Sequence, residues 1–95
     1  MSFEEFQISL SENQPPEGIN ALLLALWYDA KKDWNMSHDI ASDIHTKDGA
    51  LLHAYLHRKE GDLWNADYWY KRAGFNKYEG TLEEEWKQLV EKFIA

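Results

Sequence analysis

Hydrophobic residues between positions 17 and 31 recur at intervals of three and four, the spacing that gathers side chains on one face of a helix. Pro16 suits the first turn of such a helix, because the backbone N–H that proline lacks would have no partner there. The pattern therefore predicts a helix over about 17–31. Its inward-facing positions are Ile19, Leu22, Leu23, Leu26, Trp27 and Ala30.

Four further helices are predicted, each after a residue whose side chain can accept a hydrogen bond from the first-turn N–H groups. The capping residues are Asp33, Thr46 or Asp48, Asp62 and Thr81. The expected helix ends are Ile44, about Lys59, Ala73 and position 94. Residues 2–14 are compatible with either a short helix or an extended arm. No segment has the period-two alternation of a half-buried strand, so we expect an all-α fold.

The last predicted helix, over 82–94, has one hydrophobic and one charged face. Thr81 and Glu84 have the spacing of a capping box. Leu82, Trp86, Leu89, Val90 and Phe93 are expected to face inward, and Glu83, Glu85, Lys87, Gln88 and Lys92 to face solvent. Negative charge is favourable at a helix N-terminus, so the acidic run 83–85 needs no functional explanation.

The chain also matches itself when it is shifted by 29 residues. Leu22, Leu23 and Ala25 then fall on Leu51, Leu52 and Ala54, and Asp33 falls on Asp62. Self-similarity at a fixed period is typical of stacked helix-turn-helix units. The pattern predicts two helical hairpins.

The second hairpin resembles a tetratricopeptide repeat. Ala54, Gly61, Ala66, Tyr70 and Ala73 have the spacing of its small and aromatic positions. The first hairpin departs from that motif at Lys32, where glycine is favoured, and the repeat is shorter than the usual length of about 34 residues. The resemblance covers residues 22–74 and implies stacked hairpins.

Two runs, from His53 to Asp62 and from Asn65 to Gly74, preceded by Leu26 to Lys31, are also similar to a group of small uncharacterised bacterial proteins. That resemblance implies a compact helical protein and supplies no catalytic residue. The expected organisation is one domain over 1–95. It comprises an N-terminal segment (1–15), a first hairpin (17–45), a second hairpin (48–74) and a closing helix (81–95).

Composition narrows the classes of function. The 95 residues include five Trp, five Tyr and four Phe but no Cys, so packing of one core must stabilise the fold. A net charge of −7 argues against nucleic acid and anionic membranes as partners. The first 30 residues contain no Lys or Arg, unlike a signal or transit peptide, and we expect a cytoplasmic protein.

His53 and His57 are the sharpest candidates for chemistry, because residues four apart on a helix point the same way and can bind one metal ion. A zinc site needs a third ligand. Glu60, Asp62 or His38 would supply it only if the hairpins pack suitably. The structural alternative is a pair of partly buried histidines that make hydrogen bonds, and on the residues alone no metal or cofactor is assigned.

Aromatic and basic residues of the second hairpin are the other candidates. Trp64 and Tyr68 lie four apart and belong either to the core or to a ligand or peptide platform. Arg72 could bind a carboxylate with both guanidinium nitrogens, or form a structural salt bridge to Asp67 or Asp62.

Two functional hypotheses follow. The leading one is a non-catalytic module that binds a protein, a peptide or its own copy in a groove formed by the first helix of each hairpin. The expected contacts in that groove are Tyr55, Arg58, Lys59 and Asp29. The alternative is a small-molecule or metal-binding, enzyme-like site built on His53 and His57 with Glu60 as helper.

Overall fold

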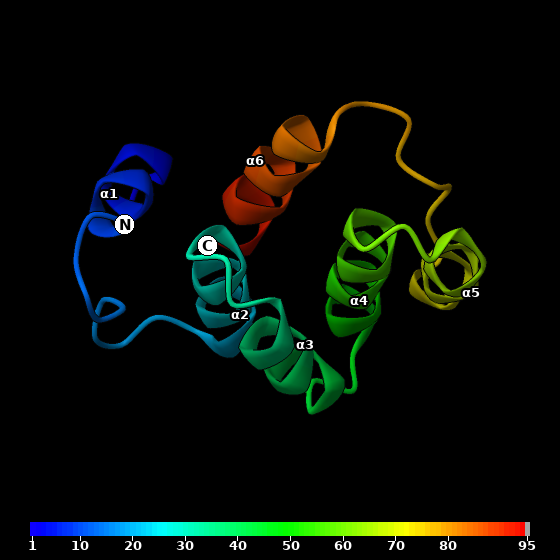
Figure 1. Cartoon of the computed structure of the whole chain (residues 1–95), viewed down its shortest axis with the longest axis horizontal. Helices are drawn as coiled ribbons and strands as arrows, with labels where there is room; N and C mark the ends of the chain where they lie inside the picture. Colours follow the sequence, from blue (N-terminus) through cyan, green and yellow to red (C-terminus); the bar gives the residue numbers. More distant parts are fainter. Residues whose placement is uncertain (95) are drawn as a thin grey trace.

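In the computed structural model, which describes residues 1–94, the chain folds into six α-helices (Figure 1). They are α1 (Phe3–Ser9), α2 (Ala21–Ala30), α3 (Trp34–Ser42), α4 (Lys47–Lys59), α5 (Leu63–Ala73) and α6 (Leu82–Phe93). No strand occurs within residues 1–94, so the predicted all-α fold class is confirmed. No helix in this part of the chain is long and apolar enough to cross a membrane.

Side chains cap α3, α4, α5 and α6 at all four predicted positions. Thr46, rather than Asp48, caps α4, because its hydroxyl oxygen accepts a hydrogen bond from the backbone N–H of Gly49 at 3.0 Å. The predicted start of the helix near residue 17 is wrong. Gly18 adopts a positive φ of 78°, and α2 begins only at Ala21, after Asn20 has capped it.

The N-terminal segment contains a helix, which settles the two alternatives left open by the sequence. A capping box between Ser2 and Glu5 starts α1. Phe6 is fully buried, and the rings of Phe3 and Phe6 lie 5.8 and 5.9 Å from that of Trp86. Burial of these two rings attaches α1 to α6.

The two predicted hairpins share one turn geometry. Lys32 and Gly61 occupy equivalent positions and both have a positive φ, of 67° and 87°. After them the N–H of Asp33 bonds to the carbonyl of Tyr28, and the N–H of Asp62 bonds to that of His57, both at 2.9 Å. The repeat seen in the sequence therefore corresponds to a repeated local structure, although Lys32 adopts a conformation that glycine adopts more easily.

The helices pack as two hairpins covered by α6. The most extensive contacts are those of α4 with α5 and of α2 with α3, and α3 also packs against α4. The closing helix α6 lies against α2 and α4, with α1 beyond it, so that α1 and α5 are at opposite ends of the molecule (Figure 1). The arrangement places α3, α4 and α5 in a row at one side.

Three tryptophan N–H groups join elements distant in sequence. The indole of Trp27 donates to the Ser9 hydroxyl at 3.2 Å, that of Trp34 to the Leu56 carbonyl at 2.9 Å, and that of Trp86 to the Leu26 carbonyl at 3.2 Å. These bonds satisfy polar groups that burial would otherwise leave unpaired. Much of the aromatic content is thus structural.

Candidate metal centre

Three histidines from two helices converge at the contact between α3 and α4. His38 comes from α3, and His53 and His57 lie four residues apart on α4. One ring nitrogen from each lies within 4.8 Å of the other two, and the Nε2 atoms of His38 and His53 are 2.8 Å apart. We call these three residues the histidine cluster.

Tryptophan rings hold two members of the cluster in place. The ring of His53 stacks on that of Trp69 with a centroid separation of 4.1 Å and an angle of 6° between the planes. The ring of His38 stacks on that of Trp34 at 4.8 Å and 13°. These contacts restrict the imidazole rotamers, so the nitrogen positions follow from packing of α3 and α5 against α4.

Burial keeps two of the imidazoles neutral. It lowers the pKa of His53 to about 4, and the neighbouring His38 and His57 add to the effect by repulsion. Burial also lowers the pKa of His38, with repulsion from His57 as the second cause. A neutral imidazole carries the lone pair that binds a metal ion, so both rings are in the ligand form at pH 7.

A carboxylate orients the third ring. Nδ1 of His57 lies 2.6 Å from Oε2 of Glu60, close enough for the ring N–H to donate a hydrogen bond. Metal-binding histidines commonly donate their other ring N–H to a carboxylate in this way. The contact leaves Nε2 of His57 for a metal ion.

A second group of potential ligands comprises His57, Glu60 and Asp62. Its carboxylates already have other partners. Glu60 binds the His57 ring, and Asp62 accepts hydrogen bonds from the backbone and side chain of Asn65, which lower its pKa. The histidine cluster is therefore the better candidate.

The residues expected to line a partner groove are occupied by contacts within the fold. Tyr55 is only 2% exposed and donates to Oδ2 of Asp29 at 2.6 Å, while Nζ of Lys59 donates to Oδ1 of the same carboxylate at 2.8 Å. Arg58 binds Glu85 at 2.8 Å and also donates to the carbonyl of Gly80. These four groove residues therefore have their polar groups committed to one another or to α6 and its preceding loop.

Burial of Glu85 is a correction to the sequence analysis, which expects this side chain in solvent. Glu85 is only 2% exposed, and its carboxylate accepts hydrogen bonds from Arg58 of α4 and Tyr70 of α5. Two donors from other helices replace the water that the carboxylate loses. A side chain on the charged face of α6 thus joins three helices.

The candidate residues on α5 lie on its outer side. Trp64 and Tyr68 are 77% and 44% exposed, with ring centroids 6.5 Å apart. The expected salt bridge of Arg72 to Asp67 or Asp62 is absent from the ion pairs of residues 1–94. Arg72 instead donates to the Tyr68 hydroxyl at 3.2 Å and lies over the rings of Trp69 and Tyr68.

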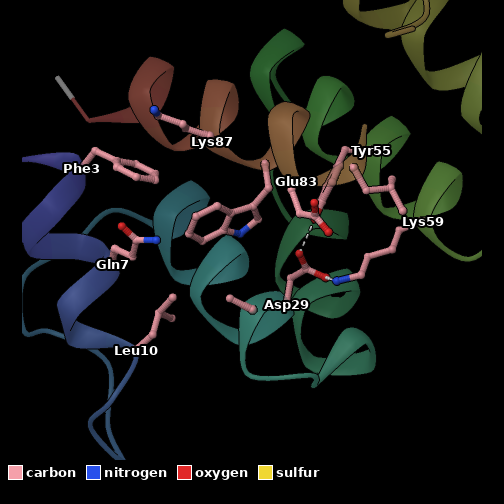
Figure 2. Close-up of a pocket in the computed structure, with 11 residues that line it drawn as sticks. Phe3, Gln7, Leu10, Asp29, Tyr55, Lys59, Glu83 and Lys87 are labelled. Carbon is pink, nitrogen blue, oxygen red and sulfur yellow. Dashed lines mark hydrogen bonds and ion pairs between the residues drawn. The ribbon is translucent and has the colours of Figure 1, made fainter. Parts of the chain in front are cut away.

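A separate cavity of about 630 Å³ lies where α1 and α6 meet α2 and α4. Figure 2 shows Phe3 and Gln7 of α1 and the following Leu10 on one side of it and the Asp29, Tyr55 and Lys59 network on the other. Asp29 already accepts hydrogen bonds from Tyr55 and Lys59, so this part of the cavity wall is committed to contacts within the fold. No pattern in the sequence predicts this cavity, because residues 2–14 are compatible with a helix or an extended arm and are not assigned to a face of the core.

Comparisons with known proteins identified no relative of this chain. A scan against models of protein families found no match, and searches of curated proteins and of solved structures likewise found none. The resemblances to tetratricopeptide repeats and to a small bacterial family therefore stay predictions.

Proposed function

We propose that this protein binds a divalent metal ion at the histidine cluster of His38, His53 and His57. Zinc is the ion we consider first. The observation that carries the proposal is the approach of three ring nitrogens from two helices to within 4.8 Å of one another. Nitrogens that bind one zinc ion at about 2.0–2.1 Å lie roughly 3.4 Å apart in tetrahedral geometry. One pair of nitrogens lies 2.8 Å apart and the other separations do not exceed 4.8 Å, so small side-chain shifts would admit the ion.

The chemistry of the ligands supports the same choice. Neutral imidazoles suit zinc, copper and nickel, whereas calcium and magnesium prefer oxygen. Three protein ligands leave a fourth position for water or for an oxygen atom of a second ligand, as at catalytic zinc sites. Nε2 of His38 and Nε2 of His53 lie 2.8 Å apart, so both nitrogens already face the same point between α3 and α4.

Zinc is expected to stabilise the native protein. A zinc concentration about 100 times the dissociation constant adds about 2.7 kcal/mol to the free energy of unfolding. For a domain of this size, that corresponds to a rise in melting temperature of roughly 10–20 °C. Thermal unfolding followed by circular dichroism, with and without ZnCl₂, measures the rise.

His57→Ala should abolish most of the zinc-dependent rise, since two ligands remain. His45→Ala is the matched control, because His45 is an exposed histidine outside the cluster. An equal rise in wild type and His57→Ala, or none in wild type, would show that zinc does not bind at this cluster.

A protein- or peptide-interaction module, self-association included, is the second candidate function. The observation that favours it is the exposure of three large apolar side chains on α5: Leu63 at 63%, Trp64 at 77% and Tyr68 at 44%. Large exposed apolar patches often mark contact surfaces. If a second copy covers this surface, sedimentation equilibrium should show a dimer that Trp64→Ser weakens. If the protein were a monomer at all concentrations measured, self-association through this surface would be excluded.

A further inference from the structure

A second cavity, of about 480 Å³, lies between the end of α3, the start of α4 and α5. Its wall includes Ile44, Lys47 and Ala50 on the α3–α4 side and Trp69 and Arg72 on α5. His53 also lines it, so the cavity adjoins the histidine cluster. We call it the α3–α5 cavity.

The charge of this cavity differs from that of the whole chain. Its wall contains Lys47 and Arg72 but no Asp or Glu, although the chain has 17 acidic residues and a net charge of −7. Three other cavities within residues 1–94 each include at least one carboxylate, from Asp29 and Glu83, from Asp67 and Glu79, or from Glu85. An anion would therefore meet the least repulsion in the α3–α5 cavity.

The two cations of the wall are not neutralised by the protein. Arg58 and Lys59 are paired with buried carboxylates, but neither Arg72 nor Lys47 takes part in an ion pair within residues 1–94. Their positive charges are therefore available to a ligand.

Aromatic contacts hold the Arg72 guanidinium in position. Its Cζ lies 5.4 Å from the ring centroid of Trp69 and 5.8 Å from that of Tyr68, whose hydroxyl accepts a hydrogen bond from Nη1. Trp69 is fixed in turn by stacking on His53. A guanidinium held in this way loses little freedom when it binds an oxyanion with two parallel hydrogen bonds.

We propose that the α3–α5 cavity binds a small organic oxyanion, a phosphate monoester or a carboxylate. Arg72 and Lys47 bind the charged group. The apolar side chains of Ile44, Ala50 and Trp69 contact the organic part, whose size is limited by the 480 Å³ of the cavity. This site goes beyond the metal site and does not depend on it, although an occupant would lie beside His53.

The test uses phenyl phosphate as the probe and the zinc-free 95-residue chain, kept with a chelator. Binding is followed in ¹⁵N–¹H correlation spectra through the indole signals of the five tryptophans, with Trp69→Phe identifying the Trp69 signal. We expect a saturable shift of the Trp69 signal and a much smaller shift of Trp86, which lines the other large cavity. Phenol, the neutral analogue, should produce no saturable shift. Benzoate, run in parallel, shows whether a carboxylate is preferred.

Arg72→Gln should weaken phenyl phosphate binding about tenfold or more, the expected effect of losing a charge-assisted pair of hydrogen bonds. Lys71→Gln removes an exposed positive charge one residue away, outside the cavity, and should change affinity less than twofold. Lys47→Gln gives an independent second variant.

The proposal is overturned if neither anion gives a saturable shift up to millimolar concentration, if phenol binds equally well, or if Arg72→Gln and Lys71→Gln have equal effects. Because zinc is absent, failure of the metal proposal leaves these outcomes unchanged.

Discussion

Replacement of Glu85 by alanine is expected to lower the free energy of unfolding by about 3–5 kcal/mol, the cost of breaking a buried ion pair from one side. The Glu85 side chain is 3% exposed and binds the guanidinium of Arg58 at 2.8 Å. It also accepts a hydrogen bond from Tyr70, and burial together with this bond raises the pKa of the Tyr70 hydroxyl. The variant leaves the Tyr70 hydroxyl without its acceptor and leaves Arg58 with only the Gly80 carbonyl, so the buried link that Glu85 makes from α6 to α4 and α5 is lost.

Urea denaturation followed by tryptophan fluorescence measures this loss. Glu91→Ala is the matched control, because Glu91 is an exposed carboxylate on the same helix, and its replacement should cost less than about 0.5 kcal/mol. Equal effects of the two substitutions would contradict the structural role assigned to Glu85.

Asp29→Ala should lower the free energy of unfolding by about 3 kcal/mol for a related reason. The carboxylate is 1% exposed and connects Tyr55 and Lys59 of α4 to the end of α2 (Figure 2). Burial and the charge of Asp29 raise the pKa of the Tyr55 hydroxyl, so the tyrosine is a hydrogen-bond donor at neutral pH. Without Asp29 this buried hydroxyl has no acceptor, while Lys59, which is 37% exposed, can turn toward water.

The same denaturation experiment on Asp67→Ala provides the comparison, since Asp67 is an exposed acidic residue within α5. A double variant, Asp29→Ala with Tyr55→Phe, should recover part of the stability because it removes the unpaired hydroxyl. If Asp29→Ala were no more harmful than Asp67→Ala, the buried network would not contribute to stability.

Local signals in the sequence predicted most of the helices. Capping residues such as Asp33, Asp62 and Thr81 act within one turn of the chain, so their effect can be read without knowledge of the fold. The start of α2 was missed because Pro16 gave a plausible first turn, while the chain instead turns at Gly18 and is capped by Asn20. The correct and the incorrect helix boundaries therefore both depend on residues within a turn or two of the helix end.

Contacts between helices were harder to predict. Glu85 has the sequence environment of an exposed residue, and only the positions of α4 and α5 show that it is buried. Likewise, a spacing of four placed His53 and His57 on one face, but the position of His38 depends on how α3 packs against α4. The sequence thus suggested two ligands, and tertiary packing supplies the third.

Binding of a metal ion by the histidine cluster is tested most directly by anomalous X-ray diffraction at the zinc absorption edge. The crystals are grown with stoichiometric zinc. We expect one strong anomalous peak bound by ring nitrogens of His38, His53 and His57 at about 2.0–2.1 Å, with a fourth, non-protein ligand. Zinc absent from this cluster, or bound elsewhere while the three imidazoles keep their direct contacts, would contradict the claim.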